Sequence, residues 1–443
     1  MAYGKGAAMP SDLAPGSKTS RAPGADPPPD LRPMHRGTVL WVALAVFAQE
    51  SVWNFYDAQV PGELRRYLTS AGLIGLIMGL DNVLGVLIQP WMGFVSDRRA
   101  REGRGRWAVI LIGAVLASVP FALIPWTNSL SALMVCVIAF AVIANAFKGV
   151  TETLVSDYVP PAHRSKAQGF VKAGVGLTII VSALISLLVL DRSITLAFAV
   201  PPALMLLLFA VSRAFLGRGP TVHPARDDTP AAGREAAPEE EPASPWAIVR
   251  NLVRDPSRAR LLLMLGIFCF AGMWSALRSQ LTPYGMETLG LSRGAAGGLA
   301  LPGAVAFLVC VIPLAYVSAR LGQVRAIRYG VGVFIAGLLI GFASPTVPGT
   351  VVAMIVTSAG YATFAVNALV ALWNLAPSRH VLGTYTGLYT VASSTGAALG
   401  PALLGFTVDL TGWRYMLLNG AFFAVVTFAV FTRLARRTPA PSA

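Results

Sequence analysis

The chain has 443 residues, of which 55% are hydrophobic and only 13% are charged, and its mean hydropathy is +0.63. Because globular proteins carry about 25% charged residues, this composition excludes a water-soluble fold and predicts a chain that lipid solvates. The net charge of +14 would suit a nucleic-acid-binding protein only if the basic residues gathered in one soluble region.

Residues 1–37 hold many Pro, Gly, Ala and Ser residues with scattered charge. They contain no short apolar core followed by a cleavage site, which argues against a signal peptide. A segment of this composition cannot bury enough apolar surface to offset its chain entropy, so we expect a disordered N-terminal tail.

Twelve segments then reach the roughly 20 apolar residues that a bilayer-spanning helix needs. They cover residues 38–58, 72–94, 107–126, 131–156, 168–190, 195–216, 259–282, 295–318, 326–343, 349–372, 381–408 and 413–434. A charged, Pro-rich loop, 217–257, separates the sixth from the seventh. The pattern predicts an all-α polytopic membrane protein with two six-helix bundles, 38–216 and 258–434, and a short C-terminal tail, 435–443.

Lysine and arginine are distributed unevenly between the two sides of this predicted topology. Most of them lie in the tails, the central loop and the loops on the same side as the N-terminus. The opposite side carries only Arg65, Arg66, Arg192, Arg293 and Arg414. By the positive-inside rule both termini and the central loop are expected in the cytoplasm, and the basic composition then reflects topology and not a nucleic-acid partner.

The two halves show traces of an internal repeat. "PWMGFVSDRR" (90–99) has a degenerate counterpart in "IPLAYVSARL" (312–321), at an offset of 222 residues. The same offset relates Asn145 to Asn367. Two matches at one offset favour a duplicated six-helix unit with pseudo-symmetric halves.

Ionisable side chains inside spans are costly unless they are paired or face a cavity. In the first segment Glu50, Trp53, Asn54 and Asp57 are spaced i, i+3, i+4 and i+7, so they form one polar stripe. We expect this stripe to line a cavity that binds substrate or a cation. A paired structural carboxyl at Glu50 and an interfacial position for Asp57 are the alternatives.

The second and fourth segments add further ionisable residues. A carboxyl at the middle of a span, as at Asp81, either takes up a proton or holds a cation, unless it serves only a structural hydrogen bond. Asn145, Lys148 and Glu152 share one face of the fourth segment, where Lys148 and Glu152 are spaced to pair within the helix. That pair is either structural or one that breaks and forms as substrate and cation bind.

The second half carries fewer candidates and no sign of enzyme chemistry. Arg278 and Asn367 are its main contributions to a polar site, although Arg278 is also placed to extend toward the membrane surface. No phosphate-binding loop occurs, and all four histidines lie in tails or loops. We therefore predict no enzymatic activity, no cofactor and no metal centre, with Na⁺ at Asp81 and Glu152 as the one ion considered.

The segment "GFVSDRRAREGRGR" (93–106) follows the second span. With twelve spans in two halves, it resembles the loop signature of the major facilitator superfamily. The resemblance implies that Gly93, Asp97, Arg98 and Arg104 form a cytoplasmic gate motif. Asp97 is then expected to contact the start of the eleventh helix near Val381 and to stabilise the outward-facing state.

A narrower resemblance comes from "LDNVLGVLIQPWMGFVSDR", "GRGRW" and "VSDYVPPAHRSKAQGF". These stretches are similar to the glycoside–pentoside–hexuronide cation symporters and the sucrose-type carriers. The resemblance implies acids on the second and fourth helices as the cation site, with Asp81 and Glu152 the nearest matches.

The expected function is alternating-access secondary transport, most simply uptake of a sugar or glycoside-like solute with H⁺ or Na⁺. A proton-antiporting exporter of drugs or natural products is the alternative, and a non-transporting receptor or scaffold is a third. The expected partners are the small-molecule substrate, the coupling cation and the lipid bilayer. We expect a monomer, because each half buries its face against the other. We expect it in the plasma membrane.

Overall fold

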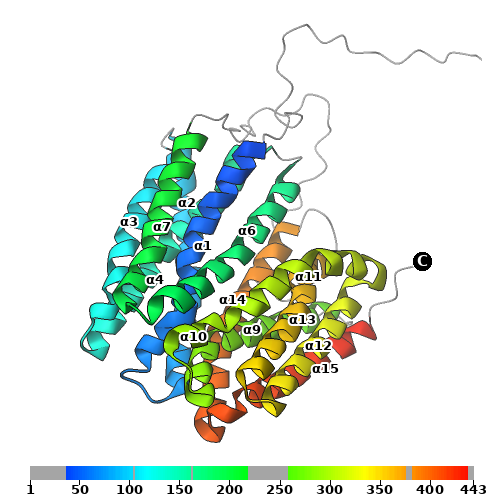
Figure 1. Ribbon diagram of the computed structural model, residues 1–443. Coiled ribbons are helices and arrows are strands. Elements are labelled where there is room, and N and C mark those ends of the chain that lie inside the picture. Colours follow the sequence, from blue (N-terminus) through cyan, green and yellow to red (C-terminus); the bar gives the residue numbers. More distant parts are fainter. Residues whose placement is uncertain (1–35, 103–104, 161–162, 218–257, 376–381, 438–443) are drawn as a thin grey trace, which may run out of the picture.

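The computed structural model describes residues 36–102, 105–160, 163–217, 258–375 and 382–437. Every regular element within these ranges is a helix (Figure 1). The first half contains α1 (Arg36–Leu64), α2 (Ala71–Arg101), α3 (Trp107–Leu123), η2 (Ile124–Trp126), α4 (Leu130–Glu152), α5 (Leu154–Tyr158), α6 (Arg164–Ile185), η4 (Ser186–Leu190) and α7 (Ile194–Leu216).

The second half contains α9 (Ala259–Leu289), α10 (Arg293–Gly298), α11 (Ala300–Leu321), α12 (Gln323–Ala343), α13 (Val347–Asn374), α14 (Leu382–Thr411), η6 (Trp413–Tyr415) and α15 (Met416–Ala435). Within the described residues, twelve helices are long and apolar enough to cross a membrane, which confirms the predicted all-α membrane fold. The expected tail before Arg36, most of the central loop, Arg104 and Val381 lie outside the described residues.

The helices run between two faces of the molecule. We call the face where α1 begins and α15 ends the tail face, and the opposite face, where α1 ends and α2 begins, the far face. Five helices that leave the far face start at a side-chain cap, in which a hydroxyl accepts a hydrogen bond from an N–H of the first turn. The caps are Ser70, Ser129, Ser193, Ser292 and Thr346.

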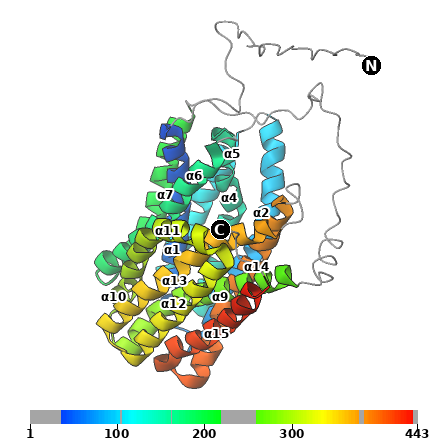
Figure 2. The ribbon, with the colours of Figure 1, turned by 90° about the vertical axis from the view of Figure 1, so that its right-hand side faces the viewer.

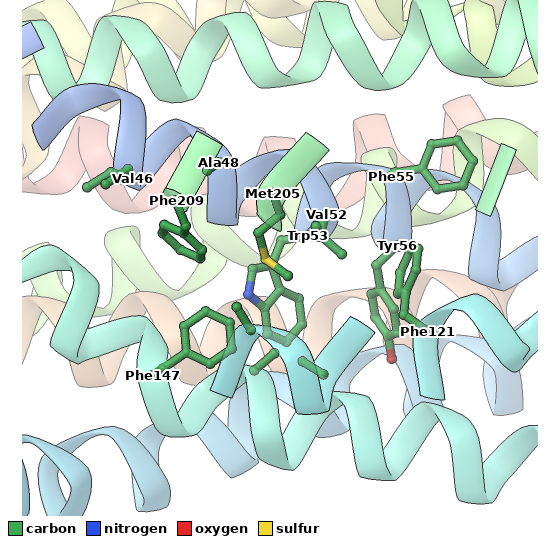
Figure 3. Close-up of a cluster of buried hydrophobic side chains, with 14 of the residues drawn as sticks. Val46, Ala48, Val52, Trp53, Phe55, Tyr56, Phe121, Phe147, Met205 and Phe209 are labelled. Atoms are coloured by element: carbon green, nitrogen blue, oxygen red, sulfur yellow. The ribbon is translucent and has the colours of Figure 1, made fainter. Parts of the chain in front are cut away.

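Each half has its own hydrophobic core. In the first half, aromatic rings of α3, α4 and α7 pack against those of α1, and part of this cluster is seen in Figure 3. Phe55 lies with its ring centroid 5.2 Å from that of Phe198 and is fully buried. Burying α1 among its neighbours in this way leaves its polar stripe facing the other half.

The two halves meet most closely near the far face. A Cβ atom on Gly79 of α2 would lie 1.8 Å from the carbonyl oxygen of Ala398 on α14, so only glycine permits this approach. Gly93, nearer the tail face on the same helix, has no atom within 4 Å of where a Cβ would stand. The end of α2 at the tail face stands apart from α14 (Figure 2), so the halves diverge toward that face.

Candidate functional site

A cavity of about 310 Å³ lies between the two halves at mid-depth, and we call it the chamber. Its walls come from α1, α2 and α4 of the first half and from α9, α13 and α14 of the second. Seven of the ten residues predicted to bind substrate or cation line it, namely Glu50, Trp53, Asn54, Asp57, Asp81, Lys148 and Arg278.

The first pair of charges in the chamber joins α1 to α4. Lys148 Nζ lies 2.9 Å from Glu50 Oε1 and 5.3 Å from the centre of the Trp53 ring. Glu152, in contrast, is exposed and has no ion pair within the part of the chain that the structure describes. Lys148 therefore pairs across two helices, and the predicted pair within α4 does not form.

The second pair joins the two halves. The Arg278 guanidinium on α9 lies 3.3 Å from Asp57 Oδ2 and donates a hydrogen bond to Asn54 Oδ1, both on α1. Asn54 Nδ2 in turn donates to Thr178 Oγ1 on α6, at 2.6 Å. Arg278 thus points into the chamber and does not extend toward a membrane surface, and its contacts tie the first half to the second at mid-depth.

Asp81 is the acid of the chamber that no base neutralises. Its side chain is 8% exposed, and Oδ1 accepts hydrogen bonds from the backbone N–H and the side-chain amide of Asn82, at 2.7 and 2.8 Å. Among the described residues no Lys or Arg lies within 4 Å of it. The chamber therefore holds two matched ion pairs and one unmatched carboxyl group.

The second half contributes an aromatic wall and several hydroxyls. Trp274 and Tyr361 stack with their ring centroids 3.9 Å apart and an interplanar angle of 5°, and both line the chamber. Ser275, Ser393 and Ser394 add hydroxyl groups nearby. Such a wall offers a stacking surface beside hydrogen-bonding groups.

Of the three predicted asparagines, Asn54 lines the chamber, whereas Asn145 and Asn367 lie outside it and have structural hydrogen bonds. Asn145 Nδ2 donates to the carbonyl oxygens of Ala141 and Asp81, and Asn145 Oδ1 accepts from Gln89. Asn367 Nδ2 donates to the carbonyl oxygen of Thr363 and to Ser318 Oγ. Each amide thus bonds the carbonyl four residues earlier and a neighbouring helix, as a duplicated unit would.

At the tail face, the gate motif is held within the first half. Asp97 Oδ1 lies 2.6 Å from Arg106 Nη1, and Arg106 Nε lies 2.8 Å from Asp157 Oδ2. Arg98 is exposed and lies 3.4 Å from Glu102 one turn on. The expected contact of Asp97 near Val381 lies outside the described residues, and Gly93, one turn before Asp97, has no atom within 4 Å of where a Cβ would stand.

At the far face, polar side chains of one half bind the other. Arg293, from the start of α10, lies 2.6 Å from the fully buried Glu63 and 3.1 Å from Gln59, both on α1. Arg65 lies 2.5 Å from Glu287 at the end of α9. The sequence predicts Arg293 and Arg65 only as loop charges, because no motif distinguishes them.

Two aspartates complete this far-face contact. Asp409, at the end of α14, accepts hydrogen bonds from the N–H groups of Ala71 and Gly72 and from Ser70 Oγ, at 2.6, 3.0 and 2.5 Å. Asp191, which follows η4, accepts a hydrogen bond of 2.7 Å from the N–H of Gly294 and another from the hydroxyl of the cap residue Ser292. Each half thereby caps a helix of the other, and Ser70 and Ser292 are separated by the repeat offset of 222 residues.

These contacts define the conformation. All hydrogen bonds and ion pairs between the halves whose two partners are described lie at the far face or at mid-depth. The far side of the chamber is therefore closed, whereas the divergence of α2 and α14 leaves its other side facing the tail face.

The family model of the Major Facilitator Superfamily matches residues 38–336 and 303–443. No curated protein matches the sequence. A solved structure of a point mutant of the nucleoside transporter NupG is similar, with 13% identity, a TM-score of 0.72, and coverage of 90% of this chain and 99% of that one.

A bacterial homologue of the human lysosomal transporter Spinster, in an inward-facing and occupied conformation, is similar over 92% of this chain and 98% of its own, with 15% identity and a TM-score of 0.71. The POT family transporter PepTSo has 13% identity and a TM-score of 0.67, over 91% of this chain and 98% of its own. At these identities the likeness concerns the fold. The family match, which covers most of the chain, establishes that this chain is a transport protein, not an enzyme, and belongs to the Major Facilitator Superfamily.

Proposed function

We propose that the protein is a secondary transporter that takes up a sugar or glycoside-like small solute together with a proton, by alternating access. The observation that carries this proposal is the unmatched Asp81 in a chamber whose other charges are paired and whose far side is closed. Rocking of the two halves about the chamber would open it to each face in turn.

The proton is the coupling ion that the chamber suits best. A carboxylate that is buried without a cationic partner is costly to keep charged, so binding of a proton at Asp81 relieves that cost. A sodium ion would need several oxygen ligands around it, and Glu152, the other acid considered, is exposed and outside the chamber. Within the described residues no group of three acidic, Cys or His side chains gathers.

The solute that fits the chamber is uncharged and polar. Glu50 is matched by Lys148 and Asp57 by Arg278, so no strong charge is left to bind an ionic solute once Asp81 is protonated. The ring of Trp274 and the hydroxyls of the second half suit the apolar face and the hydroxyl groups of a sugar.

The orientation follows from the distribution of basic residues. The tail face carries most of them and is assigned to the cytoplasm, so the conformation described is inward-facing. We place the protein in the plasma membrane, as a monomer.

An exporter is the second candidate, and the same residue favours it. An unmatched carboxylate beside aromatic rings can also bind a lipophilic cation, which would leave as a proton enters. Purified protein in liposomes separates the two. With the outside acidic, we expect radiolabelled ethyl β-D-glucoside to accumulate inside. Extrusion of ethidium against its gradient, without glucoside accumulation, would favour the exporter and contradict uptake.

A further inference from the structure

A second, smaller cavity adjoins the chamber, and we call it the annex. It has a volume of about 50 Å³ and lies where α1 and α6 of the first half meet α9, α10, α11 and α13 of the second. Its lining is mainly apolar and includes Ile179, Leu277, Leu281, Ala304, Phe307 and Met354. None of these six residues lines the chamber.

The partition between the two cavities is a polar one. Asn54, Asp57, Trp274 and Arg278 line both. The hydrogen bond from Arg278 to Asn54 and its ion pair with Asp57 therefore stand between the polar chamber and the apolar annex. A solute bound in the chamber against Trp274 is in direct contact with the entrance of the annex.

The annex also contains a polar atom without a partner. Ser182 on α6 is 3% exposed and lines the annex, and its hydroxyl makes no hydrogen bond within the described part of the chain. Buried hydroxyls almost always have a partner, and the free hydroxyl of Ser182 offers a hydrogen-bonding group to whatever occupies the annex. A mainly apolar pocket with hydroxyls at its wall, from Ser182, Thr282 and Ser358, suits an apolar group that is linked through an oxygen atom.

We propose that the annex is an apolar subsite of the transport cavity, which takes a compact alkyl substituent of the solute whose polar part fills the chamber. This inference rests on the proposed function of the chamber. An apolar cavity of about 150 Å³ binds the six carbons of benzene, so the annex holds about two carbons. The solute class is then a methyl or ethyl glycoside, and neither a free sugar nor a long-chain glycoside fills the site as well.

The first test needs no knowledge of the substrate. In the full chain with its three native cysteines replaced by serine, Ala304→Cys places a thiol in the annex and Ala397→Cys places one in the chamber. We expect Ala304→Cys to react with ethyl methanethiosulfonate but not with the charged sulfonatoethyl reagent, and Ala397→Cys to react with both. Failure of Ala304→Cys to react with the ethyl reagent, or equal reaction with both, would overturn the proposal.

The second test measures binding of glucose and of methyl, ethyl and butyl β-D-glucoside to the purified protein by calorimetry. Each buried methylene contributes about fourfold in affinity, so we expect ethyl glucoside to bind roughly fifteenfold more tightly than glucose and butyl glucoside no more tightly than ethyl. A flat series would refute the subsite.

Matched variants on one helix complete the design. Ala304→Val adds about two carbons to the wall of the annex and should remove the gain from methyl and ethyl groups. Val305→Ile enlarges the next side chain, which is exposed on the outside of the bundle, and should preserve the gain. If no member of the series binds, the sugar class proposed for the chamber is wrong, and the thiol reactions decide the annex on their own.

Discussion

Removing the Asp409 side chain should shift the protein toward a conformation open at the far face. This carboxylate of the second half caps the start of α2 in the first half through two N–H groups and the hydroxyl of Ser70. These bonds exist only while the far face is closed. The variant Asp409→Ala therefore loses stabilisation in one conformation and not in the other.

The size of the shift follows from the contacts. A side-chain cap contributes about 1 kcal/mol, and a negative charge at a helix N-terminus adds roughly 0.3–1 kcal/mol. Because Asp409 is exposed to solvent, we take about 1–2 kcal/mol in total, which corresponds to about a fivefold to thirtyfold change in the ratio of the two conformations. Asp409→Asn keeps an acceptor oxygen but loses the charge, and should give a smaller shift.

Distances between spin labels measure this ratio. Asn128 and Val347 are exposed far-face residues in different halves, and neither contributes a side-chain contact between them. With labels at both, the long-distance population should grow in the order wild type, Asp409→Asn, Asp409→Ala. An unchanged distance distribution in Asp409→Ala, at an unchanged melting temperature, would refute the assignment of Asp409 as a far-face contact.

Three further variants test the ion pairs. Lys148→Met leaves the Glu50 carboxylate without its partner and should lower the free energy of unfolding by about 1–3 kcal/mol in detergent. The double variant with Glu50→Gln should recover much of this loss. Equal stability of the single and the double variant would contradict the pairing. Arg293→Gln should cost about 2–4 kcal/mol because it leaves the fully buried Glu63 with only Arg66, and adding Glu63→Gln should restore part of it, as thermal melting can measure. Asp97→Asn removes the charge that pairs with Arg106 and should slow transport severalfold, while glucoside affinity, measured by calorimetry, stays within about twofold. Loss of binding in a folded variant would argue against a gating role.

The fold and much of the site could be predicted because the bilayer restricts the sequence so strongly. Span length and the cost of charge in lipid made Glu50, Asp57, Asp81 and Lys148 stand out, and all four line the chamber. Asn145 and Asn367 are equally polar, but their side chains donate hydrogen bonds to backbone carbonyls and do not line the chamber. Residue type alone does not separate a lining amide from a structural one.

The ion-pair partners of the charged residues could not be predicted from the sequence. The spacing along α4 favours Glu152 as the ion-pair partner of Lys148. The partner is instead Glu50 of α1, because the packing of α1 against α4 brings Glu50 and Lys148 together in the chamber. Arg293 reads as an ordinary loop charge, and its contact with Glu63 exists only because the second half lies against the first. The conformation of the halves is likewise a property of such contacts between distant segments, and no local pattern encodes it.

The role of Asp81 can be tested most directly by following protons. Liposomes that contain the purified protein and a trapped pH indicator report proton entry when ethyl β-D-glucoside is added outside. We expect the wild type and Asn82→Ala, which keeps the carboxyl group, to acidify the interior, and Asp81→Asn to exchange labelled glucoside without moving protons. Glucoside-dependent acidification that survives in Asp81→Asn would contradict the account.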